Sequence, residues 1–194
     1  LPHWTWPGRE GELTPVFVYT NYPTAELFIN GKSYGKQSKN NSSLKSRYRL
    51  MWMDAVYEPG EVKVVAYNKD GKAVAEKTVR TAGKPHHIEL VSNRNELTAD
   101  GKDLAYVTVK VVDKDGNLCP TDSRLIHFSV KGAGKFRAVA NGDPTNLEQF
   151  HLPKMHAFHG MLTAIVQAGE IAGDLVLTAK ASGVKTGTVH LQAK

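Results

Sequence analysis

The sequence contains a single cysteine, Cys119, so it can form neither an intrachain disulfide nor a cysteine-based zinc site. It also lacks the roughly 20 uninterrupted apolar residues of a membrane span, because charges, Gly or Pro interrupt every hydrophobic run. We therefore expect no membrane insertion. The chain begins with Leu1 rather than methionine and carries no signal-peptide pattern, so we interpret it as an excised piece whose compartment its ends do not reveal.

Acidic residues are the minority, with 19 Asp and Glu against 25 Lys and Arg, which gives a net charge of +6. No acid occurs between Leu27 and Met53, a window that holds Lys32, Lys36, Lys39, Lys45, Arg47 and Arg49. Proteins that bind single-stranded nucleic acid interleave such basic residues with aromatic rings. Only Tyr34 and Tyr48 do so here. We interpret the window as a solvated face of strands and loop, and we expect no nucleic-acid partner.

Helical periodicity is missing, and the apolar residues instead form short runs rich in β-branched and aromatic side chains. The runs recur about every 8 to 12 residues, the spacing of antiparallel sandwiches. We expect strands at 16–19, 26–29, 48–52, 61–67, 87–91, 105–112, 126–130, 136–140, 161–166, 175–179 and 187–191. Asn30-Gly31 and Asp70-Gly71 separate such runs, and both dipeptides accept positive φ at the two central positions of a tight hairpin.

A Gly- and Pro-punctuated segment at 81–85 separates two sets of these runs. The segment is short, so it is suited to joining the last strand of one sandwich to the first strand of the next. We therefore predict an all-β protein of two tandem immunoglobulin-like antiparallel β-sandwiches, with domains at 1–82 and 83–194.

Residues able to bind a metal are scattered. Two histidine groups invite that interpretation: His86 with His87, and His151 with His156 and His159. Neither has the short recurring spacing and the carboxylate or thiolate company of a zinc site. Asp113 to Asn117 resembles the opening of a calcium loop, but its glycine stands fourth rather than sixth and a strand pattern precedes it. We expect a hairpin there and no bound metal.

Catalytic patterns are equally weak. The sequence contains no Gly-rich phosphate loop, nucleophile elbow or His-Glu-x-x-His motif. Glycoside hydrolysis needs two carboxylates roughly 5 to 9.5 Å apart. The candidate pairs are Glu10 with Glu12, Glu58 with Glu61, and Asp143 with Glu148. None has the apolar surroundings that would raise one pKa and hold a sugar ring. We expect no catalytic residue and no cofactor.

Two segments suggest a function. Trp4 and Trp6 precede the first strand, and exposed aromatic rings there would anchor the domain on a neighbour or stack on a sugar; we favour anchoring. The second segment runs from residue 140 to residue 160 and is long for a sandwich loop. Asn141, Asp143 and Phe158 are its candidate functional residues.

Longer strings in both halves resemble a known family. In the first half they are 3–12 (HWTWPGREGE), 25–33 (AELFINGKS) and 57–60 (YEPG). They closely resemble the domain that follows the catalytic barrel in many bacterial β-galactosidases of glycoside hydrolase family 2. In the second half, 98–104, 113–117, 141–145 and 157–160 resemble the next domain in that series.

The resemblance implies a non-catalytic C-terminal accessory pair from a retaining glycosidase common in gut Bacteroidetes. Such a pair would support the catalytic barrel, its substrate entrance or oligomer contacts. No residue here matches the family's acid/base or nucleophile motif, so we expect no activity from this chain alone. The partners implied are the parent enzyme's own catalytic domain, glycans and further copies of the parent. The implied location is periplasmic or extracellular.

Two alternatives remain open. The pair could be a carbohydrate-binding module that uses Trp4, Trp6 or the loop between Asn141 and Gly160. It could also be an adhesin-type spacer, because the string from Leu97 to Asn117 resembles bacterial immunoglobulin-like repeats. The two halves do not repeat each other at a fixed period, which weakens an array.

Overall fold

The computed structural model describes residues 3–194, and all of its regular elements in that range are strands. No helix long and apolar enough to cross a membrane occurs among these residues. The chain divides into two compact units, Leu1–Thr81 (unit 1) and Ala82–Lys194 (unit 2). The predicted boundary, after Ala82, differs from this division by one residue.

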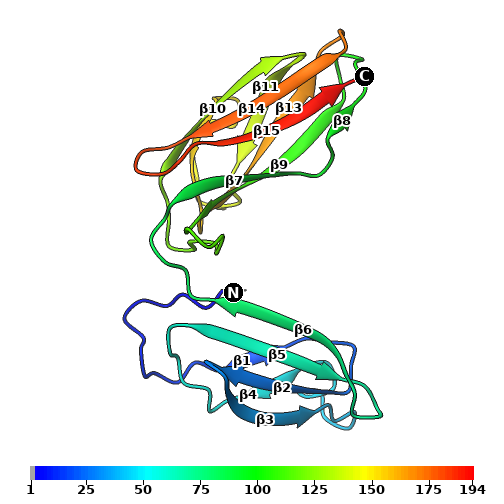
Figure 1. Cartoon of the computed structure of the whole chain (residues 1–194), viewed down its shortest axis with the longest axis vertical. Coiled ribbons are helices and arrows are strands. Elements are labelled where there is room, and N and C mark those ends of the chain that lie inside the picture. Colours follow the sequence, from blue (N-terminus) through cyan, green and yellow to red (C-terminus); the bar gives the residue numbers. More distant parts are fainter. Residues whose placement is uncertain (1–2) are drawn as a thin grey trace. The chain divides into compact units, whose positions relative to one another are not determined.

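Unit 1 contains a four-stranded sheet and a two-stranded sheet that pack face to face. Its strands are β1 (Val16–Val18), β2 (Thr24–Ile29), β3 (Lys32–Ser38), β4 (Leu50–Trp52), β5 (Glu61–Tyr67) and β6 (Ala73–Arg80). The large sheet has the order β3-β2-β5-β6, and β1 pairs with β4 in the small one (Figure 1). Alternation in β2 buries Ala25, Leu27 and Ile29 against Trp52, whose Nε1 donates a hydrogen bond of 3.0 Å to the Gly35 carbonyl.

The two predicted hairpins of unit 1 differ in their turns. Asn30 and Gly31 have φ values of 49° and 80°, so both central positions are positive as expected. At the second hairpin Gly71 has a φ of 77°, but Asp70 is not left-handed. The expectation of two positive φ values is wrong there, because the strand pairing shifts between Ala66 and Tyr67 and the turn takes in an additional residue.

Unit 2 is a sandwich of a five-stranded and a four-stranded sheet. Its strands are β7 (His87–Ser92), β8 (Glu96–Leu97), β9 (Leu104–Val112), β10 (Leu125–Gly132), β11 (Gly134–Ala140), β12 (Lys154–His156), β13 (Met161–Ala168), β14 (Gly173–Lys180) and β15 (Gly187–Ala193). The sheet orders are β12-β10-β14-β15-β8 and β11-β13-β9-β7 (Figure 1). All pairings are antiparallel except that of β15 with β8. The fold prediction of two tandem immunoglobulin-like β-sandwiches is confirmed.

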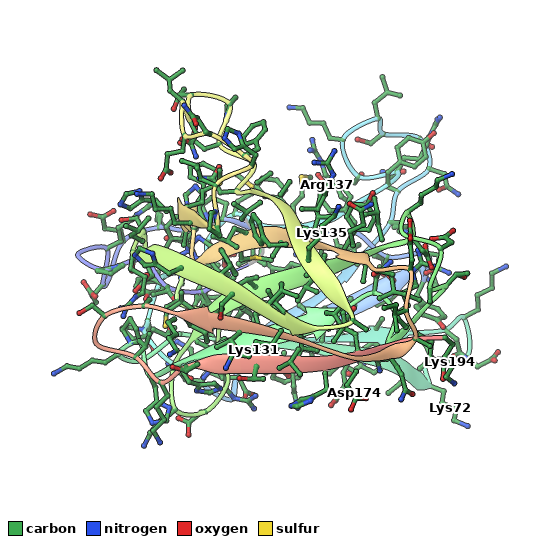
Figure 2. The ribbon with its side chains drawn as sticks, turned by 90° about the horizontal axis from the view of Figure 1, so that it is seen from above. Lys72, Lys131, Lys135, Arg137, Asp174 and Lys194 are labelled. Carbon is green, nitrogen blue, oxygen red and sulfur yellow. The ribbon has the colours of Figure 1, made fainter. Side chains whose placement is uncertain are left out.

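The alternation of β9 places Ala105, Val107, Val109 and Val111 in the core of unit 2, each 0% exposed. Facing strands supply further aliphatic residues, among them Leu177. Charged residues lie on the outer faces: Lys131 at the end of β10, Lys135 and Arg137 on β11, and Asp174 on β14 (Figure 2). The period of two along each strand therefore separates the core from the solvated surface.

Asp113 organises the turn that follows β9. It is 2% exposed. One carboxylate oxygen accepts hydrogen bonds of 2.9 Å from the backbone N–H groups of Asp115 and Asn117. The other accepts 2.8 Å from Gly83 N–H and 3.0 Å from the Asn117 side-chain amide. Burial alone would raise the pKa of Asp113, but these hydrogen bonds outweigh it and lower the pKa. The segment is a hairpin turn, as expected.

Candidate functional site

Trp4, expected to be exposed near the start of the chain, lies instead in the core of unit 1. It is 4% exposed, and its ring meets the Tyr57 ring edge-on at 5.2 Å between centroids. Its Nε1 donates a hydrogen bond of 2.9 Å to the Glu58 carbonyl. The small exposed part of Trp4 lines the groove described below, and an anchoring or sugar-stacking role stays a prediction for it, but most of its ring is enclosed. The expectation of an exposed indole is therefore wrong for Trp4.

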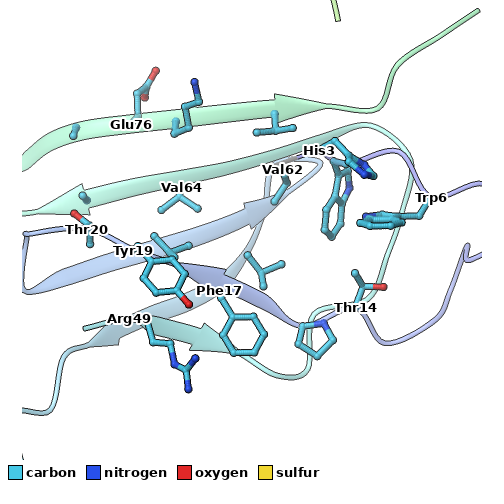
Figure 3. A pocket seen from close by; sticks show the side chains of 18 residues that line it. His3, Trp6, Thr14, Phe17, Tyr19, Thr20, Arg49, Val62, Val64 and Glu76 are labelled. Carbon is cyan, nitrogen blue, oxygen red and sulfur yellow. The ribbon is translucent and has the colours of Figure 1, made fainter. Parts of the chain in front are cut away.

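Trp6 is half-buried and lies at one end of an open groove in unit 1 (Figure 3). Its backbone N–H donates to the Tyr57 hydroxyl at 3.1 Å. Its ring lies 4.2 Å from the His3 ring, with the two planes tilted by 38°. Both rings line the groove. An anchoring or sugar-stacking role stays a prediction for Trp6.

The groove has a volume of about 830 Å³ and crosses the inner face of β5 and β6 beside β1 (Figure 3). Its floor consists of Val62, Val64 and Ala66 from β5 and Ala75, Lys77 and Val79 from β6. On the β1 side it is bordered by Phe17 and Tyr19, which are 44% and 70% exposed. The Arg49 guanidinium lies 5.4 Å from the centre of the Phe17 ring. The groove is thus mainly apolar, with charge confined to a few positions.

Glu76 is the one carboxylate among the residues that line the groove. Both inverting and retaining glycosidases place two carboxyl groups across the bond that they cleave. Among residues 3–194, the groove lining thus presents one carboxylate rather than two.

The long loop of unit 2 lies between β11 and β12 and contains two of the predicted residues. The Asn141 side-chain amide donates 2.9 Å to the His156 carbonyl and so ties the start of the loop to β12. Asp143 accepts from the backbone N–H and the hydroxyl of Thr145 at 2.9 and 2.7 Å. These two bonds, aided by the nearby charge of His159, lower the pKa of Asp143.

Phe158 opens a tight hairpin on the same side of unit 2. It exchanges backbone hydrogen bonds of 2.9 and 3.0 Å with Met161, and the two residues between them have positive φ, 51° at His159 and 73° at Gly160. The Phe158 ring lies 4.2 Å from the His159 ring. Asn141 is bonded to the carbonyl of His156, two residues before Phe158, so these two candidate residues lie on neighbouring segments.

Sequence reasoning did not pair Glu148 with His156. The carboxylate lies 3.0 Å from the imidazole Nδ1 and accepts the His156 backbone N–H at 3.1 Å. Three apolar residues close to Glu148 in the sequence are exposed: Leu147, Phe150 and Leu152, at 96%, 57% and 37%. No group of three potential metal ligands occurs in the described part of the chain.

Comparisons with known proteins agree across both units. Residues 88–190 match the model of "Glycoside hydrolase family 2 C-terminal domain 5", and residues 11–75 match a domain of unknown function, DUF4982. The β-galactosidase BoGH2A of Bacteroides ovatus is 41% identical over the whole chain. A β-galactosidase of Thermoanaerobacter pseudethanolicus is 30% identical over 85% of it. The chain spans about a fifth of the length of these relatives, 22% in both.

Solved structures give the same result. A glycosyl hydrolase family 2 member from Bacteroides cellulosilyticus matches the whole chain with a TM-score of 0.90 and 34% identity, over 24% of its own length. A β-glycosidase from Bacteroides vulgatus matches the whole chain with a TM-score of 0.91 and 31% identity, also over 24% of its length. The chain therefore belongs to the C-terminal domains of glycoside hydrolase family 2.

Proposed function

We propose that the chain is the non-catalytic C-terminal part of a longer family 2 glycosidase, called here the parent enzyme, which acts on β-galactosides. In it, the two sandwiches support the catalytic barrel and its substrate entrance or oligomer contacts. One observation carries the proposal. A protein named as a β-galactosidase matches this chain from end to end at 41% identity, yet the chain makes up 22% of that relative.

The chemistry of the described residues supports a non-catalytic role. A general acid must hold its proton near neutral pH, which requires a raised carboxyl pKa. The loop carboxylates of unit 2 have lowered pKa values instead. At Asp143 the cause is hydrogen bonding from Thr145. At Glu148 burial raises the pKa, but hydrogen bonds from His156 and Asn146 outweigh it. Both are therefore ionised near neutral pH and unsuited to protonating a leaving group.

The first experiment tests activity and substrate class together. The parent enzyme and the 194-residue chain are incubated separately with 4-nitrophenyl β-galactoside and 4-nitrophenyl β-glucuronide, because relatives of both names match the chain. We expect the parent enzyme to cleave the galactoside at least 10-fold faster than the glucuronide, and the chain alone to cleave neither. Hydrolysis by the chain alone would overturn the non-catalytic assignment, and a preference for the glucuronide would overturn the substrate class.

The second experiment tests support of the catalytic barrel. The parent enzyme is compared with a version that lacks the 194 residues, and the half-life of activity is measured during heating. We expect the truncated enzyme to inactivate at least 10-fold faster, because it loses whatever contacts the sandwiches make with the barrel. Equal half-lives and equal KM values for a galactoside would contradict a supporting role.

We also propose a periplasmic or extracellular location and an oligomeric parent enzyme, on the basis of the family resemblance. Cell fractionation followed by activity assay tests the location. Light scattering of the intact and truncated parent enzymes tests the oligomer contacts. A cytoplasmic activity, or a mass unchanged by the truncation, would count against the respective proposal.

A further inference from the structure

We propose that the groove of unit 1 holds an extended, mainly apolar segment of the parent enzyme that lies outside these 194 residues and adds a strand beside β1. The inference rests on the proposed function, because it requires the chain to be part of a longer polypeptide. It deepens that proposal by assigning the contact surface and the kind of segment that fills it.

The floor of the groove is an uncovered part of the inner sheet face. Three cross-strand pairs compose it: Val62 with Val79, Val64 with Lys77, and Ala66 with Ala75. On the neighbouring strand β2, the inward-facing residues Ala25, Leu27 and Ile29 are at most 1% exposed. On β6, by contrast, Ala75 and Lys77 are exposed although they lie on the same face. The small sheet thus covers β2 and leaves the inner face of β6 open.

The wall of the groove is a strand with a free edge. Among the strands of the described chain, β1 pairs with β4 alone, through Val16, Phe17 and Val18. Its other edge borders the groove and has no strand partner among residues 3–194, so its backbone N–H and C=O groups are available for pairing. An added strand would bond to that edge and lay alternate side chains on the floor. A glycan would meet valine or alanine methyl groups at five of the six floor residues, which cannot bond to its hydroxyls, and a donor at Lys77 alone.

The kind of segment that fills the groove follows from the length of the related enzymes and from the charge of the groove lining. The solved family 2 enzyme from Bacteroides cellulosilyticus contains this whole fold in 24% of its chain, so most of that polypeptide lies outside the matched region. Residues that line the groove carry two fixed positive charges, on Arg49 and Lys77, against one negative charge on Glu76. The segment that fits is therefore mainly apolar where it crosses the floor, with an acidic residue near Lys77 or Arg49.

Cysteine labelling tests the proposal with adjacent residues of β6. Ala75→Cys places a thiol on the groove floor. Val74→Cys places one on the preceding residue, which is exposed and does not line the groove. The natural Cys119 gives little background, because burial raises the pKa of its thiol to about 11. Each variant is made in the 194-residue chain and in the parent enzyme. Maleimide labelling is timed, and the labelled peptide is identified by mass.

In the 194-residue chain we expect both thiols to label at similar rates. In the parent enzyme we expect Ala75→Cys to label at least 10-fold more slowly, with Val74→Cys unchanged. Equal labelling of Ala75→Cys in the chain and the parent enzyme would overturn the proposal, as would equal protection of the two thiols in the parent enzyme. Glycosidase activity is measured on the same parent preparations. An inactive parent enzyme would contradict the proposed function, whereas an active parent enzyme with a rapidly labelled Ala75→Cys would contradict only the filled groove.

Two further measurements exclude other occupants. Protection of Ala75→Cys in the 194-residue chain by 4-nitrophenyl β-galactoside or a galacto-oligosaccharide would overturn the proposal in favour of a glycan site. Protection that grows with the concentration of the chain alone would overturn it in favour of a second copy. Labelling that is independent of both additions supports a segment of the parent enzyme.

Discussion

Removal of the Asp113 carboxylate should destabilise unit 2 more than any other single polar substitution that we consider. In Asp113→Ala, the backbone N–H groups of Gly83, Asp115 and Asn117 and the Asn117 amide lose their acceptor. Asp113 is 2% exposed, so water replaces the carboxylate poorly. Hydrogen bonds to a charged group contribute about 1.5 to 3 kcal/mol each and are not additive, so we expect a loss of about 4 kcal/mol.

The isosteric variant Asp113→Asn separates charge from shape. Its amide oxygen can accept from Asp115 and Asn117, but its amide nitrogen then faces the donors on Gly83 and the Asn117 side chain. We expect a loss of about 2 to 3 kcal/mol, since roughly half of the accepted bonds are replaced by donor–donor contacts. A loss in Asp113→Asn as small as that of a surface substitution would contradict the importance of the charge.

The assay uses the distribution of tryptophan. Trp4, Trp6 and Trp52 all lie in unit 1, so tryptophan fluorescence follows unit 1, and calorimetry follows both units. With about 4 °C per kcal/mol for a unit of this size, Asp113→Ala should lower the melting temperature of unit 2 by about 15 °C. The fluorescence transition should stay in place. An equal shift of the fluorescence transition would refute a local role for Asp113.

The pH dependence has a definite sign. Because folding lowers the pKa of Asp113, its carboxylate stabilises unit 2 fully above the unfolded pKa of about 4, and the stabilisation is lost as pH falls through the lower folded pKa. The difference in melting temperature between the wild type and Asp113→Ala should therefore shrink as pH falls below about 4. A difference that grows with acidity would contradict the argument.

Three further predictions concern other sites. Gly160→Ala should destabilise unit 2 by at least 2 kcal/mol in denaturant unfolding, because the added Cβ would lie 2.3 Å from the Cys119 carbonyl oxygen. The control variant Gly142→Ala places its Cβ in open space, so it should cost about 1 kcal/mol for its positive φ alone. The Cys119 thiol, with its pKa raised to about 11 by burial, should react with Ellman's reagent at pH 8 only in denaturant; rapid reaction of the folded chain would contradict its burial. Trp4→Ala should lower the free energy of unfolding of unit 1 by about 3 to 4 kcal/mol, because Trp4 is buried, and Trp6→Ala should lower it by about 1 kcal/mol, because Trp6 is only half-buried. Equal losses would contradict this difference in burial.

The buried strands could be predicted because their own residues determine them. The alternation from Ala105 to Val112 predicts β9, which lies inside the four-stranded sheet and packs against the opposite sheet. The Asn30-Gly31 turn is equally local, since both residues tolerate positive φ. The edge strand β6 was not predicted as a full strand, because its exposed run from Ala73 to Arg80 mixes small and charged side chains.

The candidate site could be predicted only in part, because its geometry depends on distant residues. Trp4 packs against Tyr57 and is bonded to the Glu58 carbonyl, both more than 50 positions away in the sequence, so no local pattern predicts those contacts. The loop residues Asn141 and Asp143 could be selected from loop length alone. The groove could not, since it arises where β1 has no second strand neighbour in the described part of the chain, and such an absence leaves no pattern in the sequence.

The position of β15 sets the order in which the molecule can be completed on the ribosome. β15, residues Gly187–Ala193, lies inside its sheet, between β14 and the parallel strand β8. Unit 2 therefore cannot close this sheet until its last strand has emerged, whereas β6 completes unit 1 by Arg80. During translation, unit 1 can therefore fold before β15 is available to pair with β14 and β8 in unit 2.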